Sequence, residues 1–137
     1  MQKRIAFLEE TTAELGLTGI KAIHGRAETF ARDKGSRENY ELCVSRAVAN
    51  LASLSEYCIP YVKVGGRFVS YKSGKIHEEL LQAAKAIDVL GGKVDNTVYF
   101  NIPDTDMERS LVVVKKVRQT PKKYPRKAGT PTKEPIV

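Results

Sequence analysis

A chain of 137 residues has room for one folded domain, which at this size buries about 68% of the surface that the unfolded chain exposes. Its 42% hydrophobic content excludes disorder along the whole length. The formal net charge of +7 points to an anionic partner, and this charge is unevenly placed. Residues 118–137 carry six basic side chains against one acid, a net +5, so residues 1–117 carry only +2.

Several classes of protein are excluded by the same inspection. The longest apolar runs, such as Leu111–Val114, have four or five residues and are too short to span a membrane. The start, Met1–Arg4, leads into an acidic amphipathic stretch and does not resemble a signal peptide. Cys43 and Cys58 fit neither a disulfide framework nor a CxxC metal site, so we expect reduced, buried thiols in a cytosolic protein. Two histidines are too few for a metal cluster, and no metal is expected.

The hydrophobic pattern predicts alternating helices and strands separated by glycine, proline or polar turns. The expected helices cover 5–15, 51–58 and 76–90; the expected strands cover 19–24, 40–45, 67–71, 94–102 and 111–117, with a polar loop or irregular helix over 26–39. Strands separated by helices pair in parallel, whereas the short polar link between the last two strands favours an antiparallel hairpin. The predicted fold is an α/β sheet with an antiparallel edge.

Polar segments follow three of these strands, where ligands bind in open α/β sheets. They are His24–Glu28, Ser45–Ala47 and Lys72–Gly74. Each alone is typical of an ordinary loop, but three in register favour a ligand site. The chain has no GxGxxG sequence, no Walker A sequence and no other glycine-rich turn between strand and helix. It also shows no Ser-His-Asp or Cys-His arrangement, so no catalytic residue is predicted.

The C-terminal segment has a composition of its own. Residues 120–135 contain four of the six prolines, with cations spaced among them. We expect this segment to be extended and exposed. It would neutralise nucleic-acid phosphates by counterion release, with Tyr124 stacking on a base, or else act only as a disordered solubilising tail.

The segment Lys122–Ile136 resembles the C-terminal signature of the RsmG family, also called GidB. Further segments match that family in order and spacing: Lys3–Leu8, His24–Glu28, Ser45–Ala47, Gly66–Val69 with Lys72, and Arg109–Val113. The family comprises enzymes that use S-adenosyl-L-methionine to methylate N7 of a guanine in bacterial 16S ribosomal RNA. The resemblance thus implies a cytoplasmic methyltransferase whose partner is 16S rRNA or the small ribosomal subunit.

The resemblance also implies roles for individual residues. Those implied to bind the cofactor are Ala27 and Glu28, at its adenine end, and Arg46. Those implied or expected to bind RNA are Lys72, Arg109, Lys122, Lys123, Arg126 and Lys127.

One departure from the family is large. The family has an N-terminal segment with two strands and a Gly-x-Gly loop, which these 137 residues lack. Its sheet order is 3-2-1-4-5-7-6, so the absent strands belong at the centre of the sheet. We therefore expect a partial Rossmann-like methyltransferase domain over 1–117 and a basic, proline-rich tail over 118–137.

Three interpretations follow from this departure. The chain is an incomplete methyltransferase, or a non-catalytic fragment that binds RNA through its tail, or an unrelated α/β binding protein. For the first two we expect very weak or absent cofactor binding, because the glycine loop is missing. Unpaired strand edges would also favour self-association.

Overall fold

The computed structural model of the chain describes residues 2–46 and 49–137. In chain order the elements are α1 (Gln2–Glu14), α2 (Ala27–Phe30), β1 (Tyr40–Arg46), α3 (Leu51–Cys58), the 3-10 helix η1 (Ile59–Tyr61), β2 (Val62–Ser73), α4 (His77–Val89), β3 (Gly92–Asn101), β4 (Glu108–Lys116) and α5 (Thr130–Lys133). The longest described helices have 13 residues, and no described helix is long and apolar enough to cross a membrane.

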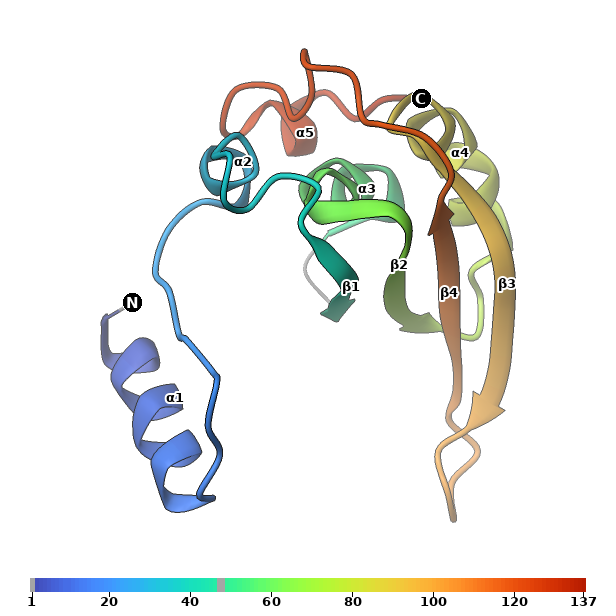
Figure 1. The fold of residues 1–137 in the computed structure, drawn as a ribbon. Helices are drawn as coiled ribbons and strands as arrows, with labels where there is room; N and C mark the ends of the chain where they lie inside the picture. The colour runs from blue at the N-terminus through green and yellow to red at the C-terminus, as the bar shows by residue number, and fades with distance from the viewer. Residues whose placement is uncertain (1, 47–48) are drawn as a thin grey trace.

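The strands form one sheet in the order β1-β2-β4-β3. β1 pairs with β2 in parallel, and β4 pairs antiparallel with both β2 and β3. The parallel crossover and the terminal antiparallel hairpin are confirmed. The order also matches the 4-5-7-6 end of the sheet expected from the resemblance, with β1 at one edge (Figure 1).

The two faces of the sheet differ. Phe68, Val112 and Val114 point to one face, where they are at most 1% exposed in a core completed by α3 and α4. Alternate residues of the strands point to the other face, because side chains alternate along a strand. On that face Leu42 and Val44 are more than half exposed.

Local sequence explains where the helices begin and end. The Asn50 side chain accepts a hydrogen bond from the Ser53 amide at 2.9 Å and caps α3, whereas Pro60 follows its last turn. After α4 the chain turns at Gly91, whose φ is +93°. A Cβ there would lie 2.3 Å from the Arg118 carbonyl oxygen, so only glycine fits this position.

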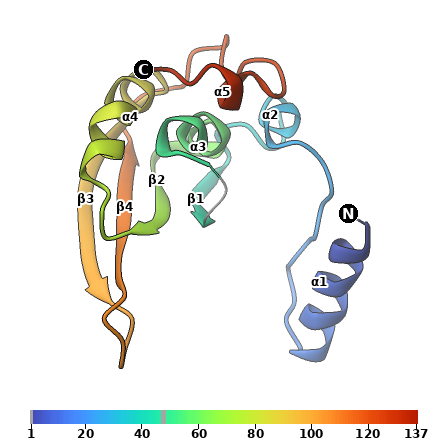
Figure 2. The ribbon, with the colours of Figure 1, turned by 180° about the vertical axis from the view of Figure 1, so that it is seen from behind.

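The predicted strand over 19–24 is wrong. These residues belong to no strand, and Ile20 and Ile23 are more than half exposed. A strand needs a neighbour to pair its amides and carbonyls, and in the part of the chain that the structure describes no strand lies beside this segment. α1 contributes no buried residue and stands apart from the sheet (Figures 1 and 2).

The C-terminal segment is not extended as expected, although its lysines are exposed. Residues 118–137 run back across α2 and α3 and include the short helix α5 (Figures 1 and 2). Thr120, Pro125 and Pro131 are buried. The segment folds because distant side chains satisfy its main chain. The guanidinium of Arg37 donates to the carbonyls of Thr120 at 2.9 Å, Pro121 at 3.1 Å and Tyr124 at 2.8 Å.

Candidate functional site

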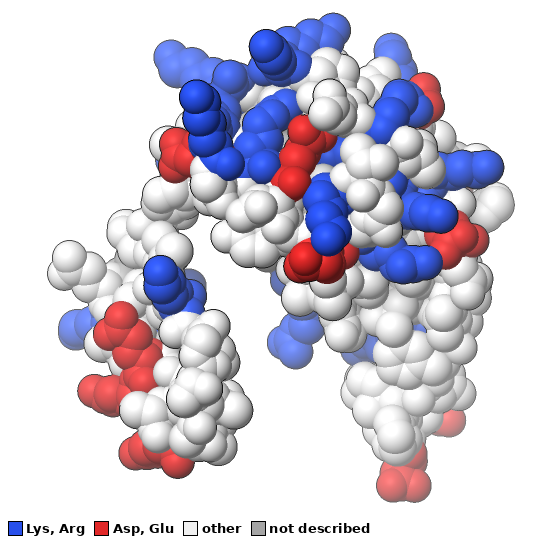
Figure 3. Space-filling view, in the orientation of Figure 1, with Lys and Arg blue, Asp and Glu red and all other residues white. Residues whose placement is uncertain are grey.

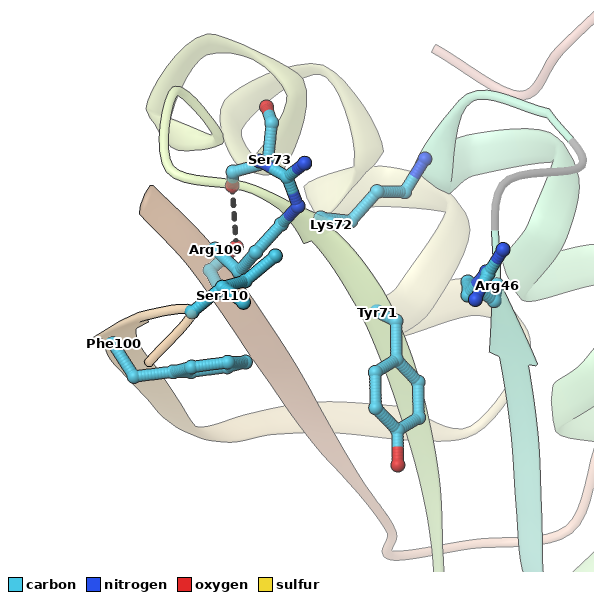
Figure 4. Close-up of a pocket in the computed structure, with 8 residues that line it drawn as sticks. Arg46, Tyr71, Lys72, Ser73, Phe100, Arg109 and Ser110 are labelled. Carbon is cyan, nitrogen blue, oxygen red and sulfur yellow. Dashed lines mark hydrogen bonds between the residues drawn. The ribbon is translucent and has the colours of Figure 1, made fainter. Parts of the chain in front are cut away.

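A pocket of about 600 Å³ lies at the edge of the sheet where β1, β2 and β3 end and β4 begins (Figure 4). This is the edge at which α/β sheets bind ligands. Its walls come from all four strands and from the residue after β3. The lining residues are Arg46, Tyr71, Lys72, Ser73, Phe100, Ile102, Arg109 and Ser110.

Three residues that the sequence singled out meet in this pocket. Arg46 is the last residue of β1, Lys72 lies near the end of β2, and Arg109 lies near the start of β4. They come together because β2 pairs with both β1 and β4. Ala47, from the predicted Ser45–Ala47 segment, lies outside the described residues.

The ammonium of Lys72 is held on the helix-covered side of the sheet. It donates to the Ala49 carbonyl at 2.7 Å and pairs with Glu79 at 2.7 Å. Glu79 also accepts from the Leu51 amide at 2.6 Å. Lys72 therefore ties the start of α3 to the start of α4, and its predicted role toward RNA stays a prediction.

Arg109 is oriented by its own strand. Its guanidinium donates to the Glu108 carbonyl at 2.9 Å and lies 3.8 Å from the Met107 sulfur. Beside it, the Ser110 hydroxyl donates to the Ser73 carbonyl at 2.7 Å and links β4 to β2 (Figure 4).

Sequence reasoning missed the aromatic part of the pocket. Tyr71 and Phe100 line it and are 45% and 38% exposed. Strand alternation could have put each ring on one face of its own strand. It could not bring them together, because Phe100 reaches Tyr71's side only through the pairing of β3 with β4 and of β4 with β2.

Ala27 and Glu28, the predicted contacts of the adenine end of the cofactor, lie in α2 and do not line this pocket. Burial raises the pKa of Tyr61 to about 12, and its hydroxyl donates to the Ala27 carbonyl at 2.6 Å. The Glu28 carboxylate is buried and accepts from the Gly129 amide at 2.9 Å. The assignment of Ala27 and Glu28 to the cofactor site stays a prediction.

The four tail cations proposed for RNA divide into two kinds. Lys122, Lys123 and Lys127 are exposed, and the Lys123 ammonium lies 5.2 Å from the centre of the Tyr124 ring. Arg126 instead pairs with the buried Glu56 at 2.7 Å, and this hydrogen-bonded pair raises the pKa of Arg126. Arg126 thus anchors the tail to α3.

Charge is unevenly spread over the surface. Figure 3 shows lysines and arginines gathered over the end of the molecule formed by the tail and α2, whereas acidic side chains gather on α1 and at the hairpin tip. Over residues 2–46 and 49–137, no group of three or more His, Cys, Asp or Glu could hold a metal ion.

Solved structures share this fold. An rRNA methylase from Streptococcus thermophilus superposes with a TM-score of 0.56 at 13% identity, over 86% of this chain and 70% of that one. A SAM-dependent O-methyltransferase from Thermotoga maritima gives 0.51 at 15% identity, over 88% of this chain and 49% of that one. The sheet therefore has the Rossmann-like fold of the methyltransferases.

The model of the family described as GidB, rRNA small subunit methyltransferase G, matches residues 1–112, and the chain belongs to this family. It is 54% identical over 137 residues to the ribosomal RNA small subunit methyltransferase G of Lachnoclostridium phytofermentans, covering 100% of this chain and 57% of that protein. The protein of the same name from Limosilactobacillus reuteri strain DSM 20016 is 53% identical, covering 99% and 57%. The resemblance inferred from the sequence is confirmed. The chain spans little more than half the length of these relatives and matches their C-terminal part.

Proposed function

We propose that this chain is the C-terminal part of a cytoplasmic methyltransferase that transfers a methyl group from S-adenosyl-L-methionine to N7 of a guanine in 16S ribosomal RNA. One observation carries the proposal: Arg46 and Arg109, matched to the family by sequence, line one pocket at the ligand-binding edge of the sheet.

The described residues supply only part of a site for S-adenosyl-L-methionine. Arg46 is exposed at the end of β1, and its planar guanidinium suits a carboxylate such as that of the cofactor. The Glu28 carboxylate is engaged by the tail, and the chain has no glycine-rich turn for close approach to the cofactor. When bound, the cofactor would supply an electrophilic methyl group.

The proposed reaction requires no side chain to act as a general acid or base. Guanine N7 carries a lone pair in the neutral base and accepts a methyl group without prior loss of a proton. The task of the protein is then to hold the base in line with the methyl donor, and positioning of this kind is worth roughly 7–11 kcal/mol. A pocket of cationic and aromatic side chains is consistent with that task.

A second candidate is a non-catalytic fragment that keeps RNA affinity. It is favoured by the exposed tail cations Lys122, Lys123 and Lys127. These 137 residues contain no glycine-rich turn between strand and helix, so under either candidate we expect this polypeptide alone to bind S-adenosyl-L-methionine very weakly or not at all. A titration by calorimetry tests this expectation, and micromolar affinity would contradict it.

A chimera separates the two candidates. In it, the matching C-terminal part of the Lachnoclostridium relative is replaced by this chain, which aligns over its full length. Transfer of a labelled methyl group to unmethylated small ribosomal subunits is expected, with loss of that transfer on Arg46→Ala. A folded chimera without transfer, beside an active parent relative, would favour the non-catalytic fragment.

The tail's contribution to RNA affinity is tested by reversing only its exposed charges, Lys122, Lys123 and Lys127 to Glu. Each lost phosphate contact lowers the slope of log K against log salt by about 0.7 on single-stranded RNA. We expect the slope to fall by about 2 in the triple variant. Arg126 is left unchanged because it anchors the tail to Glu56. An unchanged affinity and slope would remove the tail from the RNA site.

A further inference from the structure

We propose that the face of the sheet opposite to the core, which we call the open face, carries a row of three cations that binds the phosphates of an RNA backbone. The cation row consists of Arg67 on β2, Lys115 on β4 and Lys93 on β3. It lies at the end of the sheet where β4 runs into the tail, away from the pocket at the carboxyl edge (Figure 1). The inference deepens the proposed function, on which it rests for the identity of the ligand.

The register of the sheet sets the three side chains beside one another. Arg67 and Lys93 are both paired with Lys115, one from each side. Phe68 and Lys116, the next residues after Arg67 and Lys115, are buried on the core side. Side chains alternate along a strand and paired residues point to the same face, so the whole row points to the open face. Neighbouring strands lie about 4.8 Å apart, which makes the row about 10 Å long.

The positive charge of the row is not neutralised by the domain itself. All three side chains are exposed. Over residues 2–46 and 49–137, other cations pair with acids, as Lys63 does with Glu41 at 3.1 Å, but no member of the row forms an ion pair. The next row of paired residues on the open face carries no charge, since it consists of Val69, Val113 and Asn96.

This arrangement favours a bound anion. Like charges directly opposite each other on neighbouring strands destabilise a sheet, and an anion bound across the row would remove that repulsion. A hollow of about 370 Å³ lies against the row, and Lys93 and Lys115 form part of its wall. Asp95 also lines the hollow, but it forms no ion pair among the described residues.

The place of the row favours an extended polyanion over a small anion. β4 ends at Lys116, and the chain continues directly into the tail with its exposed Lys122, Lys123 and Lys127. Figure 3 shows lysines and arginines gathered over the end of the molecule where the tail lies. A single phosphate group would occupy either the row or the tail lysines, whereas a chain of phosphates would contact both. Such contacts hold and orient RNA without reading its sequence.

The test compares two triple variants of this chain that lose the same charge. The row variant carries Arg67→Gln, Lys93→Gln and Lys115→Gln. The control variant carries Lys3→Gln, Arg4→Gln and Lys21→Gln, which also remove one arginine and two lysines from exposed positions, on α1 and in the segment after it. Fluorescence anisotropy of a labelled single-stranded oligouridine gives the RNA affinity of each protein over a range of salt concentrations.

The expected effect follows from counterion release. Each phosphate contact contributes about 0.7 to the slope of log K against log salt on a single strand, so the row variant should lose about 2 from this slope. The same relation gives a loss of RNA affinity of about 100-fold at about 0.1 M salt when three contacts are removed. The control variant should keep the slope and the affinity of the wild type.

A second measurement separates lost binding from lost folding. Lys115→Gln removes the cation that faces the other two, so its melting temperature, followed by circular dichroism, should rise above that of the wild type. Lys21→Gln has no cation paired opposite to it and should leave the melting temperature unchanged.

Three results would overturn the inference. The first is an equal salt slope for the row variant and the control variant. The second is a lower melting temperature for Lys115→Gln, which would show that the row stabilises the sheet. The third is a loss of binding to phosphatidylglycerol vesicles with RNA affinity unaltered, which would identify a membrane-binding surface. Methyl transfer by the chimera is measured without these variants, so a failed cation row and a failed methyltransferase assignment are distinguishable.

Discussion

The pair between Arg126 and Glu56 links the tail to the body of the domain, and Arg126→Met breaks it. The Glu56 side chain is 1% exposed and accepts three hydrogen bonds from the Arg126 guanidinium, at 3.0, 3.2 and 2.7 Å. Among the described residues, the variant leaves the buried carboxylate with the main-chain amide of residue 126 as its one donor, at 2.7 Å.

Removing one partner of a buried ion pair costs about 3–5 kcal/mol, because the other charge stays buried without compensation. The remaining amide bond favours the lower end of this range. With an unfolding entropy of about 2.1 cal/mol/K per residue, 137 residues give about 0.3 kcal/mol/K. Arg126→Met should therefore lower the melting temperature by about 10 °C or slightly more.

The reverse change should cost less. In Glu56→Gln the charge that loses its partner is that of Arg126. This side chain is 28% exposed to water and also donates to the Glu134 carbonyl at 2.8 Å, so its charge remains solvated. We expect about 1–2 kcal/mol, the cost of impaired hydrogen bonding. The double variant Arg126→Met with Glu56→Met should recover most of the loss, since apolar replacement of a buried pair is often neutral.

Chemical denaturation with circular dichroism detection measures these differences, and Lys127→Met is the matched control. Lys127 is the exposed neighbour of Arg126, so its loss should change stability by no more than about 0.5 kcal/mol. Equal stabilities of Arg126→Met and Lys127→Met would refute the anchoring role. So would a double variant less stable than Arg126→Met alone.

Two further predictions concern the thiols and the free sheet edge. A hydrogen bond from the Cys58 thiol lowers the pKa of Cys43. Alkylation of Cys43 should therefore begin at lower pH than for an ordinary cysteine, and it should shift to higher pH in Cys58→Ala. Iodoacetamide labelling followed by mass spectrometry measures this, and identical pH profiles of the two proteins would contradict it. β1 is an edge strand, and its residues Leu42 and Val44 are exposed. The chain should therefore self-associate as its concentration rises, and Leu42→Lys should reduce that self-association. A wild-type chain that stays monomeric in analytical ultracentrifugation would show that this edge is protected.

Elements whose stability comes from local pattern were predictable. The sequence of α4 has an apolar stripe at helical spacing, and the polar segment over 104–109 predicts the hairpin of β3 and β4. The strand residues over 19–24 have the same apolar character, yet form no strand, because strand formation depends on a neighbour that no local pattern supplies.

The candidate site divides in the same way. Arg46, Lys72 and Arg109 were identified from the sequence, since motifs and strand ends are local features. The engagement of Glu28 by Gly129 and of Glu56 by Arg126 spans 101 and 70 residues of chain. Only the folded chain brings such partners together, and through them a tail predicted to be extended packs on the domain with its lysines exposed.

The sequence by itself therefore determined the family, the order of most elements and the cations at the strand ends. The tertiary structure decided which of those cations face the pocket, which serve as anchors, and that Tyr71 and Phe100 stand on one open face. The reason is physical: residue type sets what a side chain can bind, but strand register and long-range packing set what lies within its reach.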